Sequence, residues 1–157
     1  VYADYDKTKQ TVLSLKGYID AQPKSIQLCH IDAVPDNFLF VTGKDGSEEI
    51  KLTDWEYAGM QDPHLDVAMF IIYAMYDRDS AEKLIDLYFS DGCDKATRLK
   101  IYCYIAVSGL VWSNWCEFKR HCGVEFGAYA QRQYDYAREY TKIFFKEYRE
   151  AFGRDYV

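Results

Sequence analysis

The stretch that decides the fold is Cys29-His30-Ile31-Asp32-Ala33-Val34-Pro35-Asp36-Asn37-Phe38-Leu39. It contains the pattern H-x-D-x-x-x-x-N, and it lies between two apolar runs, residues 26–31 and 37–42. Both runs have strand length, so we expect a buried strand, a short loop and a second strand. A loop of this kind lets the Asp32 and Asn37 side chains point into one cleft.

A third strand is expected at residues 49–53, directly before Asp54. The segment Gly43-Lys44-Asp45-Gly46 is rich in turn residues, which favours a hairpin between the second and third strands. Asp54 would then stand at the end of the second strand of this hairpin.

These side chains have the chemistry of phosphoryl transfer to an alcohol. A kinase needs an Asp that accepts the proton of the attacking hydroxyl, an Asn shortly after it that binds Mg²⁺, and a second Asp that holds Mg²⁺ against the phosphates. Asp32, Asn37 and Asp54 supply these groups in that order. The competing interpretation is structural, because Asp and Asn are common turn residues around a proline such as Pro35, and His30 would then be an interior histidine.

The remaining sequence has helical periodicity. Apolar stripes predict helices at residues 4–21, 65–76, 81–89, 94–121 and 128–152, with a break at residues 123–127. Because strands and helices do not alternate along the chain, a doubly wound sheet is excluded. The expected fold class is mainly α, a helical bundle with a small β-hairpin region.

Composition sets further limits. The 157 residues carry a formal net charge of −6, which argues against a nucleic-acid-binding surface. Five cysteines without a CxxC pair favour a reducing compartment over a disulfide framework, and a cytoplasmic protein is expected. No segment has the apolar length of a membrane span, so membrane insertion is not expected.

Further segments carry a resemblance to a known family. Leu52-Thr53-Asp54-Trp55-Glu56-Tyr57-Ala58-Gly59 follows the third expected strand, and Asp62-Pro63 precedes Asp66-Val67-Ala68. Together with the loop from His30 to Asn37, these segments resemble the choline kinase and aminoglycoside phosphotransferase superfamily, and within it the choline/ethanolamine kinases of bacterial type. The resemblance implies the C-terminal lobe of a protein-kinase-like fold over residues 1–157.

The resemblance also implies a role for each motif residue. Asp32 would be the catalytic base, and Asn37 and Asp54 would bind Mg²⁺. His30 and Asp66 would support the loop through hydrogen bonds without taking part in the chemistry. ATP would be the phosphoryl donor, and choline or a similar small amino alcohol would be the acceptor.

In this family a Trp-x-x-Trp helix and a following Tyr-bearing helix surround a trimethylammonium group. Trp112 and Trp115 match the first helix, and Tyr129 matches the second. Physical chemistry supports this match, because a quaternary ammonium has no N–H group and is recognised by aromatic faces. Residues three apart also share one face of a helix. The alternative is core packing, which we expect for Tyr136 and Tyr140.

Three more positions bear on the substrate pocket. Glu56 and Tyr57 directly follow Asp54, so we expect them on the substrate side of the cleft; the alternative for Glu56 is a solvated loop acid. Eukaryotic family members carry an acid one or two turns into the helix that contains Asp66. This chain reads Phe70-Ile71-Ile72-Tyr73-Ala74 there, so an aromatic side chain would replace the acid.

The other half of a kinase site is missing from the sequence. It has no G-x-G-x-x-G motif and no strand-borne Lys before His30. The 29 residues before His30 are too few for a nucleotide-covering lobe. We therefore expect the N-terminal lobe to be absent and this chain alone to be inactive. The competing functions are a kinase for ethanolamine, an aminoglycoside or another small alcohol, and a non-catalytic choline-binding lobe.

Overall fold

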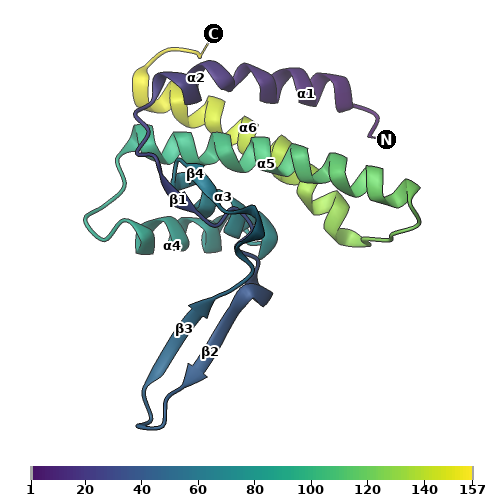
Figure 1. Cartoon of the computed structure of the whole chain (residues 1–157). Helices are drawn as coiled ribbons and strands as arrows, with labels where there is room; N and C mark the ends of the chain where they lie inside the picture. The colour runs from purple at the N-terminus through teal and green to yellow at the C-terminus, as the bar shows by residue number, and fades with distance from the viewer. Residues whose placement is uncertain (1, 157) are drawn as a thin grey trace.

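Two long helices, α5 (Lys95–His121) and α6 (Ala128–Phe152), form the centre of the fold. In this computed structural model, which describes residues 2–156, the two helices pack against each other (Figure 1). They approach closely at Gly109, where a Cβ atom would lie 2.7 Å from the Gln133 carbonyl oxygen and 2.8 Å from Tyr136 Cβ. Glycine is therefore required at this position, because any side chain would push the helices apart.

The sequence pattern of α6 explains this packing. Its buried side chains recur every three or four residues and so share one face: Gln133, Tyr134, Tyr136, Ala137, Tyr140, Thr141, Phe144 and Tyr148. Tyr136 and Tyr140 are 0% and 1% exposed, which confirms the prediction that both belong to the core. Full burial of an apolar side chain such as Phe144 contributes roughly 1.5–3 kcal/mol to folding.

Helix α3 (His64–Tyr73) lies against α5, and α4 (Arg78–Tyr88) follows beside it. Helix α3 is apolar all round after Asp66, which is typical of a helix covered on several sides. Helix α4 is amphipathic and begins at Asp77, whose side chain accepts a hydrogen bond from Ser80 N at 2.9 Å. Helices were predicted over both segments, and the structure confirms them with ends shifted by up to three residues.

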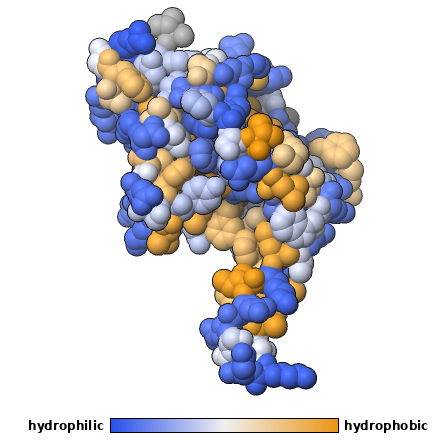
Figure 2. Space-filling view, turned by 60° about the vertical axis from the view of Figure 1, so that its left-hand side comes forward, coloured by the Kyte–Doolittle hydropathy of each residue, from blue (hydrophilic) through white to orange (hydrophobic). Residues whose placement is uncertain are grey.

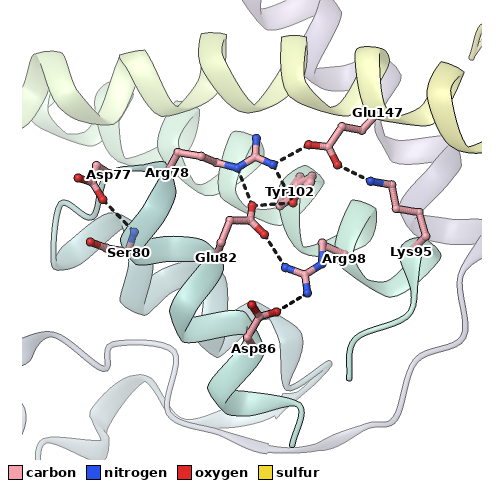
Figure 3. Close-up of polar contacts among 9 residues, drawn as sticks. All are labelled: Asp77, Arg78, Ser80, Glu82, Asp86, Lys95, Arg98, Tyr102 and Glu147. Atoms are coloured by element: carbon pink, nitrogen blue, oxygen red, sulfur yellow. Dashed lines mark hydrogen bonds and ion pairs between the residues drawn. The ribbon is translucent and has the colours of Figure 1, made fainter. Parts of the chain in front are cut away.

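A network of ion pairs joins α4, α5 and α6 (Figure 3). Glu147 of α6 accepts hydrogen bonds from Arg78 of α4 and Lys95 of α5, each at 2.5 Å. Arg98 of α5 pairs with Glu82 of α4. Because these groups are partly exposed, each pair contributes little to stability. Their positions nevertheless connect the consecutive helices α4 and α5 to the C-terminal helix α6.

The N-terminal segment is divided where one helix was expected over residues 4–21. The structure has α1 (Tyr5–Ser14) and α2 (Lys16–Ala21) instead. They meet at Leu15, whose backbone N–H donates to the Val12 carbonyl at 3.1 Å. This is a tighter, 3₁₀-type turn, and it keeps the fully buried Leu15 side chain directed into the core.

The strands form two separate antiparallel pairs. Strands β2 (Phe38–Thr42) and β3 (Glu48–Leu52) make the predicted hairpin, which projects from the helical body (Figure 1). Its turn is closed by a hydrogen bond from Gly43 N to Ser47 O at 2.7 Å. Gly46 adopts φ 83°, a conformation that glycine takes without strain.

The other pair corrects the prediction for the first strand. Strand β1 (Gln27–Cys29) pairs with β4 (Gly59–Gln61), which was not expected. The prediction that the first strand is buried is wrong for most of it: Cys29 is buried, but Leu28 is 63% exposed. Successive side chains of a strand point to opposite faces of the pair. In the part of the chain that the structure describes, the face with Cys29 packs on the core and the face with Leu28 is exposed.

Apolar side chains are exposed on both strand pairs. Figure 2 shows hydrophobic surface where the projecting hairpin joins the body. The exposed large residues on the strands include Leu28, Leu39, Phe40, Ile50 and Met60. Exposed apolar groups of this size and number are typical of an interaction surface. Separately, among residues 2–156 no helix is both long and apolar enough to cross a membrane.

Candidate active site

The loop between β1 and β2 is held in place by the side chain of Asp66 of α3. Its two carboxylate oxygens accept hydrogen bonds from His30 N and Ile31 N, each at 2.8 Å. Ile31 has φ 69°, a left-handed conformation that costs a β-branched residue roughly 1–2 kcal/mol. Two hydrogen bonds to a charged acceptor offset this strain, so Asp66 fixes the backbone directly before Asp32.

The side chain of His30 ties this loop to the end of the hairpin. His30 Nε2 lies 2.7 Å from the Thr53 carbonyl oxygen, which can only accept, so the proton is on Nε2. The ring is 2% exposed and packs edge-on against Trp55 at 4.7 Å between centroids. His30 therefore sets the position of the residue after Thr53, which is Asp54.

Asn37 makes the second link between the loop and the hairpin. Its side-chain Nδ2 donates to the Asp32 carbonyl at 2.9 Å, and its own carbonyl accepts a hydrogen bond from Thr53 N at 3.0 Å. It lies in a short 3₁₀ turn, Pro35–Asn37, one residue before the strand that was expected to include it. Asp32, Asn37 and Asp54 are thus gathered at one junction.

The oxygen atoms at this junction suit a hard cation. Asp54 is exposed, has a left-handed backbone with φ 64° and ψ 60°, and its carboxylate accepts no hydrogen bond from any residue within 2–156. Because Asn37 uses Nδ2 for the Asp32 carbonyl, its Oδ1 remains for a ligand. Carboxylate and amide oxygens are what Mg²⁺ prefers, with phosphates and water completing its shell. Consistent with so few protein ligands, no group of three His, Cys, Asp or Glu suited to a metal occurs among the described residues.

The half-buried Asp32 adjoins aromatic side chains from two helices. Burial and the neighbouring Asp32 carboxylate raise the pKa of the Tyr73 hydroxyl well above its usual range. The pKa of Tyr129 is raised by burial, by Cys116 and by the charge of Asp32. Both phenols therefore remain protonated and neutral.

Tyr73 and Tyr129 belong to a continuous aromatic cluster, which consists of Tyr73, Trp112, Trp115, Phe126 and Tyr129. Ring centroids are 5.5 Å apart for Tyr73 and Trp112, and 5.2 Å for Trp112 and Trp115. Phe126 follows at 5.2 Å from Trp115 and 6.4 Å from Tyr129. The cluster draws on α3, α5, the α5–α6 loop and α6, and its Tyr73 and Tyr129 ends lie near Asp32.

The two tryptophans differ in their surroundings. Trp112 is half-buried and packs on the core, and its indole Nε1 is buried without a hydrogen-bond partner among the described residues. Trp115 is 40% exposed, and Lys119 Nζ lies 5.5 Å from its ring centroid. The Trp115 ring therefore already contacts a cation from its own helix, while the Trp112 ring contacts Tyr73.

Two predicted pocket residues are not brought to this cluster. Glu56 and Tyr57 lie in a short 3₁₀ turn, Trp55–Tyr57, and both side chains are exposed, Tyr57 by 62%. In the described part of the chain, no hydrogen bond or ring contact joins them to the aromatic cluster. The geometry thus favours the alternative stated for Glu56, a solvated loop acid.

Two cluster members were missed as site residues in the sequence. Tyr73 stands where the family's acid was found to be lacking, so the sequence carried a signal for it. Phe126 lies in the loop between α5 and α6, beside Gly127, and its position in the sequence does not indicate a contact with the tryptophans. Helical spacing cannot place a loop residue against a helix, because the loop conformation is not periodic.

A buried ion pair anchors the segment that leads into α3. Asp62 accepts hydrogen bonds from Lys100 Nζ at 2.6 Å, Tyr104 at 3.1 Å and His64 N at 3.1 Å. Lys100 also donates to the Pro23 carbonyl at 2.8 Å. The side chains of Asp62 and Lys100 are only 4% and 2% exposed. This pair fixes where α3 begins, and hence where Asp66 meets the loop.

Comparison with known proteins identifies relatives for this arrangement. The sequence profile of the choline/ethanolamine kinase family matches residues 2–91. Protein LicA of Haemophilus influenzae is 30% identical over 121 residues, which is 69% of this chain and 41% of that protein.

Solved structures give the same result. Choline kinase LicA from Streptococcus pneumoniae has a TM-score of 0.70 and 28% identity, over 90% of this chain and 49% of that one. A structure of LicA in complex with AMP has a TM-score of 0.71 and 28% identity, over 91% of this chain and 48% of that one. The chain thus spans about half the length of the relatives it matches. The expected class, a mainly α, kinase-like fold with a small β region, is confirmed.

Proposed function

Because the chain belongs to the choline/ethanolamine kinase family, we propose that it carries the base, the metal ligands and the alcohol pocket of an ATP-dependent kinase for choline. The position of Asp32 carries this proposal. The residue adjoins both the Asn37–Thr53 junction and the aromatic cluster. A kinase for a cationic alcohol needs its base between the metal site and the ammonium site. The reacting hydroxyl must reach the base and the metal-bound phosphate while the ammonium group of the same molecule stays in its own site.

In this proposal Asp32 accepts the proton of the choline hydroxyl as the oxygen attacks the γ-phosphoryl group. Such a transition state is loose, so the protein contributes mainly by positioning and by electrostatic stabilisation. Asp66 and His30 hold the loop that carries Asp32 and take no direct part. The bond that forms joins the choline oxygen to the γ-phosphorus, the bond from that phosphorus to the β,γ-bridging oxygen breaks, and ADP leaves with that oxygen.

Asn37 and Asp54 are the residues that would hold Mg²⁺. A bound Mg²⁺ neutralises the developing charge on the phosphates. The exposed Asp54 carboxylate and the Asn37 Oδ1 atom support this role, because both are oxygen ligands without a competing hydrogen bond among the described residues.

The aromatic cluster would receive the trimethylammonium group. A quaternary ammonium is bound by aromatic faces at about 0.5–2 kcal/mol per ring. Trp112, Trp115 and Tyr129 were expected to form this site, and the contacts of Tyr73 and Phe126 extend it.

ATP would bind between this chain and a further segment that covers the nucleotide. Two observations support that view. The relatives are about twice as long, and one LicA structure is a complex with AMP. The strands beside the catalytic loop also expose apolar side chains such as Phe40, which is 80% exposed, and Ile50, 63% exposed.

The test is an Asp32→Asn variant of the full-length protein, assayed for ATP-dependent phosphorylation of choline and, in parallel, of ethanolamine and an aminoglycoside. Loss of a general base typically costs about 10²–10⁴-fold in rate, so we expect kcat for choline to fall by at least about a hundredfold. Asp36→Asn, in the same loop and exposed, is the matched control. Near-normal turnover of Asp32→Asn would remove the base assignment.

The same experiment separates the rival functions. If wild-type protein prefers ethanolamine or an aminoglycoside, the kinase class stands and the choline assignment fails. If it phosphorylates none of these alcohols, calorimetric titration with choline and with Mg·ATP decides the outcome. Choline binding without nucleotide binding would establish a non-catalytic lobe and refute the kinase proposal.

A further inference from the structure

A groove lies between α1 and α6, away from the catalytic loop. Its volume is about 340 Å³, which is in the range of small-molecule binding sites. Figure 1 shows α1 and the projecting hairpin at opposite ends of the molecule. On α6, the groove residue Lys142 lies roughly 20 Å beyond Tyr129 of the aromatic cluster, at about 1.5 Å of helix per residue. The groove is therefore separate from the candidate active site.

The charge of this groove is opposite to that of the whole chain. Lys7, Arg138 and Lys142 line it together with the carboxylate of Asp4, whereas the chain carries a formal net charge of −6. Among residues 2–156, no carboxylate forms an ion pair with Lys7 or Lys142. Two ammonium groups on facing helices repel each other, and an anion bound between them would remove that repulsion.

The carboxylate of Asp4 holds Arg138 but does not use all of its donors. Arg138 Nε lies 3.2 Å from Asp4 Oδ2, and the Tyr134 hydroxyl donates to Asp4 Oδ1 at 2.9 Å. Within the described residues, the two terminal nitrogens of Arg138 donate no hydrogen bond. A guanidinium held through Nε can therefore present its remaining N–H groups to an oxyanion in a fork geometry.

We infer that this groove binds a small organic phosphate monoester. At neutral pH the phosphate group of a monoester carries a charge of about −1.5 to −2. That charge matches the two lysines that have no carboxylate partner in the described part of the chain. A ligand with a single negative charge would leave one of them unpaired. The inference goes beyond the proposed kinase function and does not depend on it.

The organic part of the ligand would lie against the apolar lining, which Ala137 and Phe145 contribute. The nearby hydroxyl groups are engaged within their own helices. Thr141 Oγ1 donates to Ala137 O at 2.6 Å, and Thr11 Oγ1 donates to a backbone carbonyl of α1 at 2.8 Å. Recognition therefore depends on the cations for the phosphate and on Phe145 for the rest of the ligand. Inorganic phosphate has no organic part, so it should bind less tightly.

Calorimetric titration of the full-length protein with phenyl phosphate tests the inference. EDTA in the buffer removes divalent cations, so that the junction of Asn37 and Asp54 recruits no phosphate through a metal. Inorganic phosphate and benzoate are titrated in parallel, because the first lacks the organic part and the second carries a single charge. We expect phenyl phosphate to bind at least about fivefold more tightly than either. Its affinity should also rise between about pH 5 and pH 7, because its second proton dissociates near pH 6.

Two double variants locate the site. Lys7→Gln/Lys142→Gln removes the unpaired charges of the groove, so the affinity for phenyl phosphate should fall by at least about tenfold. Lys9→Gln/Lys146→Gln is the matched control, because it removes the same charge from the same two helices at positions that do not line the groove. Its affinity should stay within about twofold of wild type, since distant surface charges are screened by salt. All four side chains are exposed, so both variants should fold, which circular dichroism checks.

Each outcome supports or overturns a stated part of the inference. Equal affinity in the two double variants would overturn the groove as the site, because phenyl phosphate would then bind elsewhere. Inorganic phosphate or benzoate binding as tightly as phenyl phosphate would overturn the monoester assignment. Absence of binding to the wild-type protein would overturn the whole inference. None of these measurements uses kinase activity, so their result is distinguishable from a failure of the proposed function.

Discussion

The hydrogen bonds of Asp66 allow a quantitative test of how the catalytic loop is held. Asp66→Asn preserves the shape of the side chain but removes its charge and replaces one acceptor oxygen by an NH₂ donor. A hydrogen bond to a charged group contributes about 1.5–3 kcal/mol, and Asp66 accepts two of them, from His30 N and Ile31 N. Asn retains one neutral acceptor, which contributes about 1 kcal/mol, so about 2–5 kcal/mol should be lost.

This loss should appear in both catalysis and stability. Ile31 is already strained at φ 69°, so the loop has an alternative conformation to relax into once its anchor weakens. If the active loop must be populated for turnover, about 2–5 kcal/mol corresponds to a roughly 30- to 5,000-fold fall in kcat. Because β1–β4 pairing and His30 also hold the loop, we regard this range as an upper bound.

The assay is kcat for choline phosphorylation by the full-length protein, at a temperature where circular dichroism shows the variant folded. Urea titration measures its free energy of unfolding in parallel. Asp91→Asn is the control, because it removes the same charge from an exposed turn. If Asp66→Asn turns over within about twofold of wild type, the loop does not depend on this carboxylate and our account of its positioning is wrong.

Two stability predictions follow from buried and bridging charges. Lys100→Met should destabilise the chain by about 3–5 kcal/mol, because it leaves Asp62 buried without its partner, and urea titration at several pH values measures this. Burial acts to raise the pKa of Asp62, but the bonds from Lys100 and His64 N hold it below its usual range. In wild type this stabilisation is therefore present above the ordinary pKa and is lost as the pH falls through the lowered one. In Lys100→Met the bonds from Tyr104 and His64 N remain but the cation is lost, so burial of the charge is less compensated. The deficit should therefore shrink toward acid as Asp62 protonates; a pH-independent deficit would contradict the reasoning. Glu147→Gln should lower the free energy of unfolding by about 1 kcal/mol, and by less at high salt. The control Glu150→Gln, on an exposed side chain, should hardly change it. Equal losses in the two variants, measured by urea titration, would show that the ion pairs of Glu147 do not stabilise the packing of the three helices.

The sequence was most informative where one local signal was enough. The hairpin of β2 and β3 follows from the turn at Gly43 to Gly46 and from strand length, and it is found as predicted. Helix α6 begins and ends where its apolar period does. The closeness of Asp32 and Asn37 could also be predicted from local sequence. They are only five residues apart in a short loop, so their positions relative to each other have little freedom.

The errors arise where the outcome depends on a distant partner. The pairing of β1 with β4 joins segments about thirty residues apart, and no short turn connects the two strands that would predict it from the sequence. Burial of β1 was inferred from its apolar side chains, but hydrophobicity gives only a tendency, and Leu28 faces outward in the described structure. The expectation that Glu56 lies beside the substrate stays a prediction, and its exposed side chain in the turn Trp55–Tyr57 is compatible with the alternative of a solvated acid.

Tyr73 illustrates a residue whose importance the sequence can flag but not interpret. Its position was recognised as the place of a missing acid, but a half-buried tyrosine is as consistent with packing as with function. The structure adds that its ring lies 5.5 Å from that of Trp112 of α5 and that the Asp32 charge helps to raise its pKa. Helical spacing relates Tyr73 to Asp66, and the bonds of Asp66 relate it to the loop, but only the packing of α3 on α5 adds the indole. An acid in this place would bring a second negative charge beside Asp32, and like charges at such a distance disfavour each other. A neutral phenol avoids that cost.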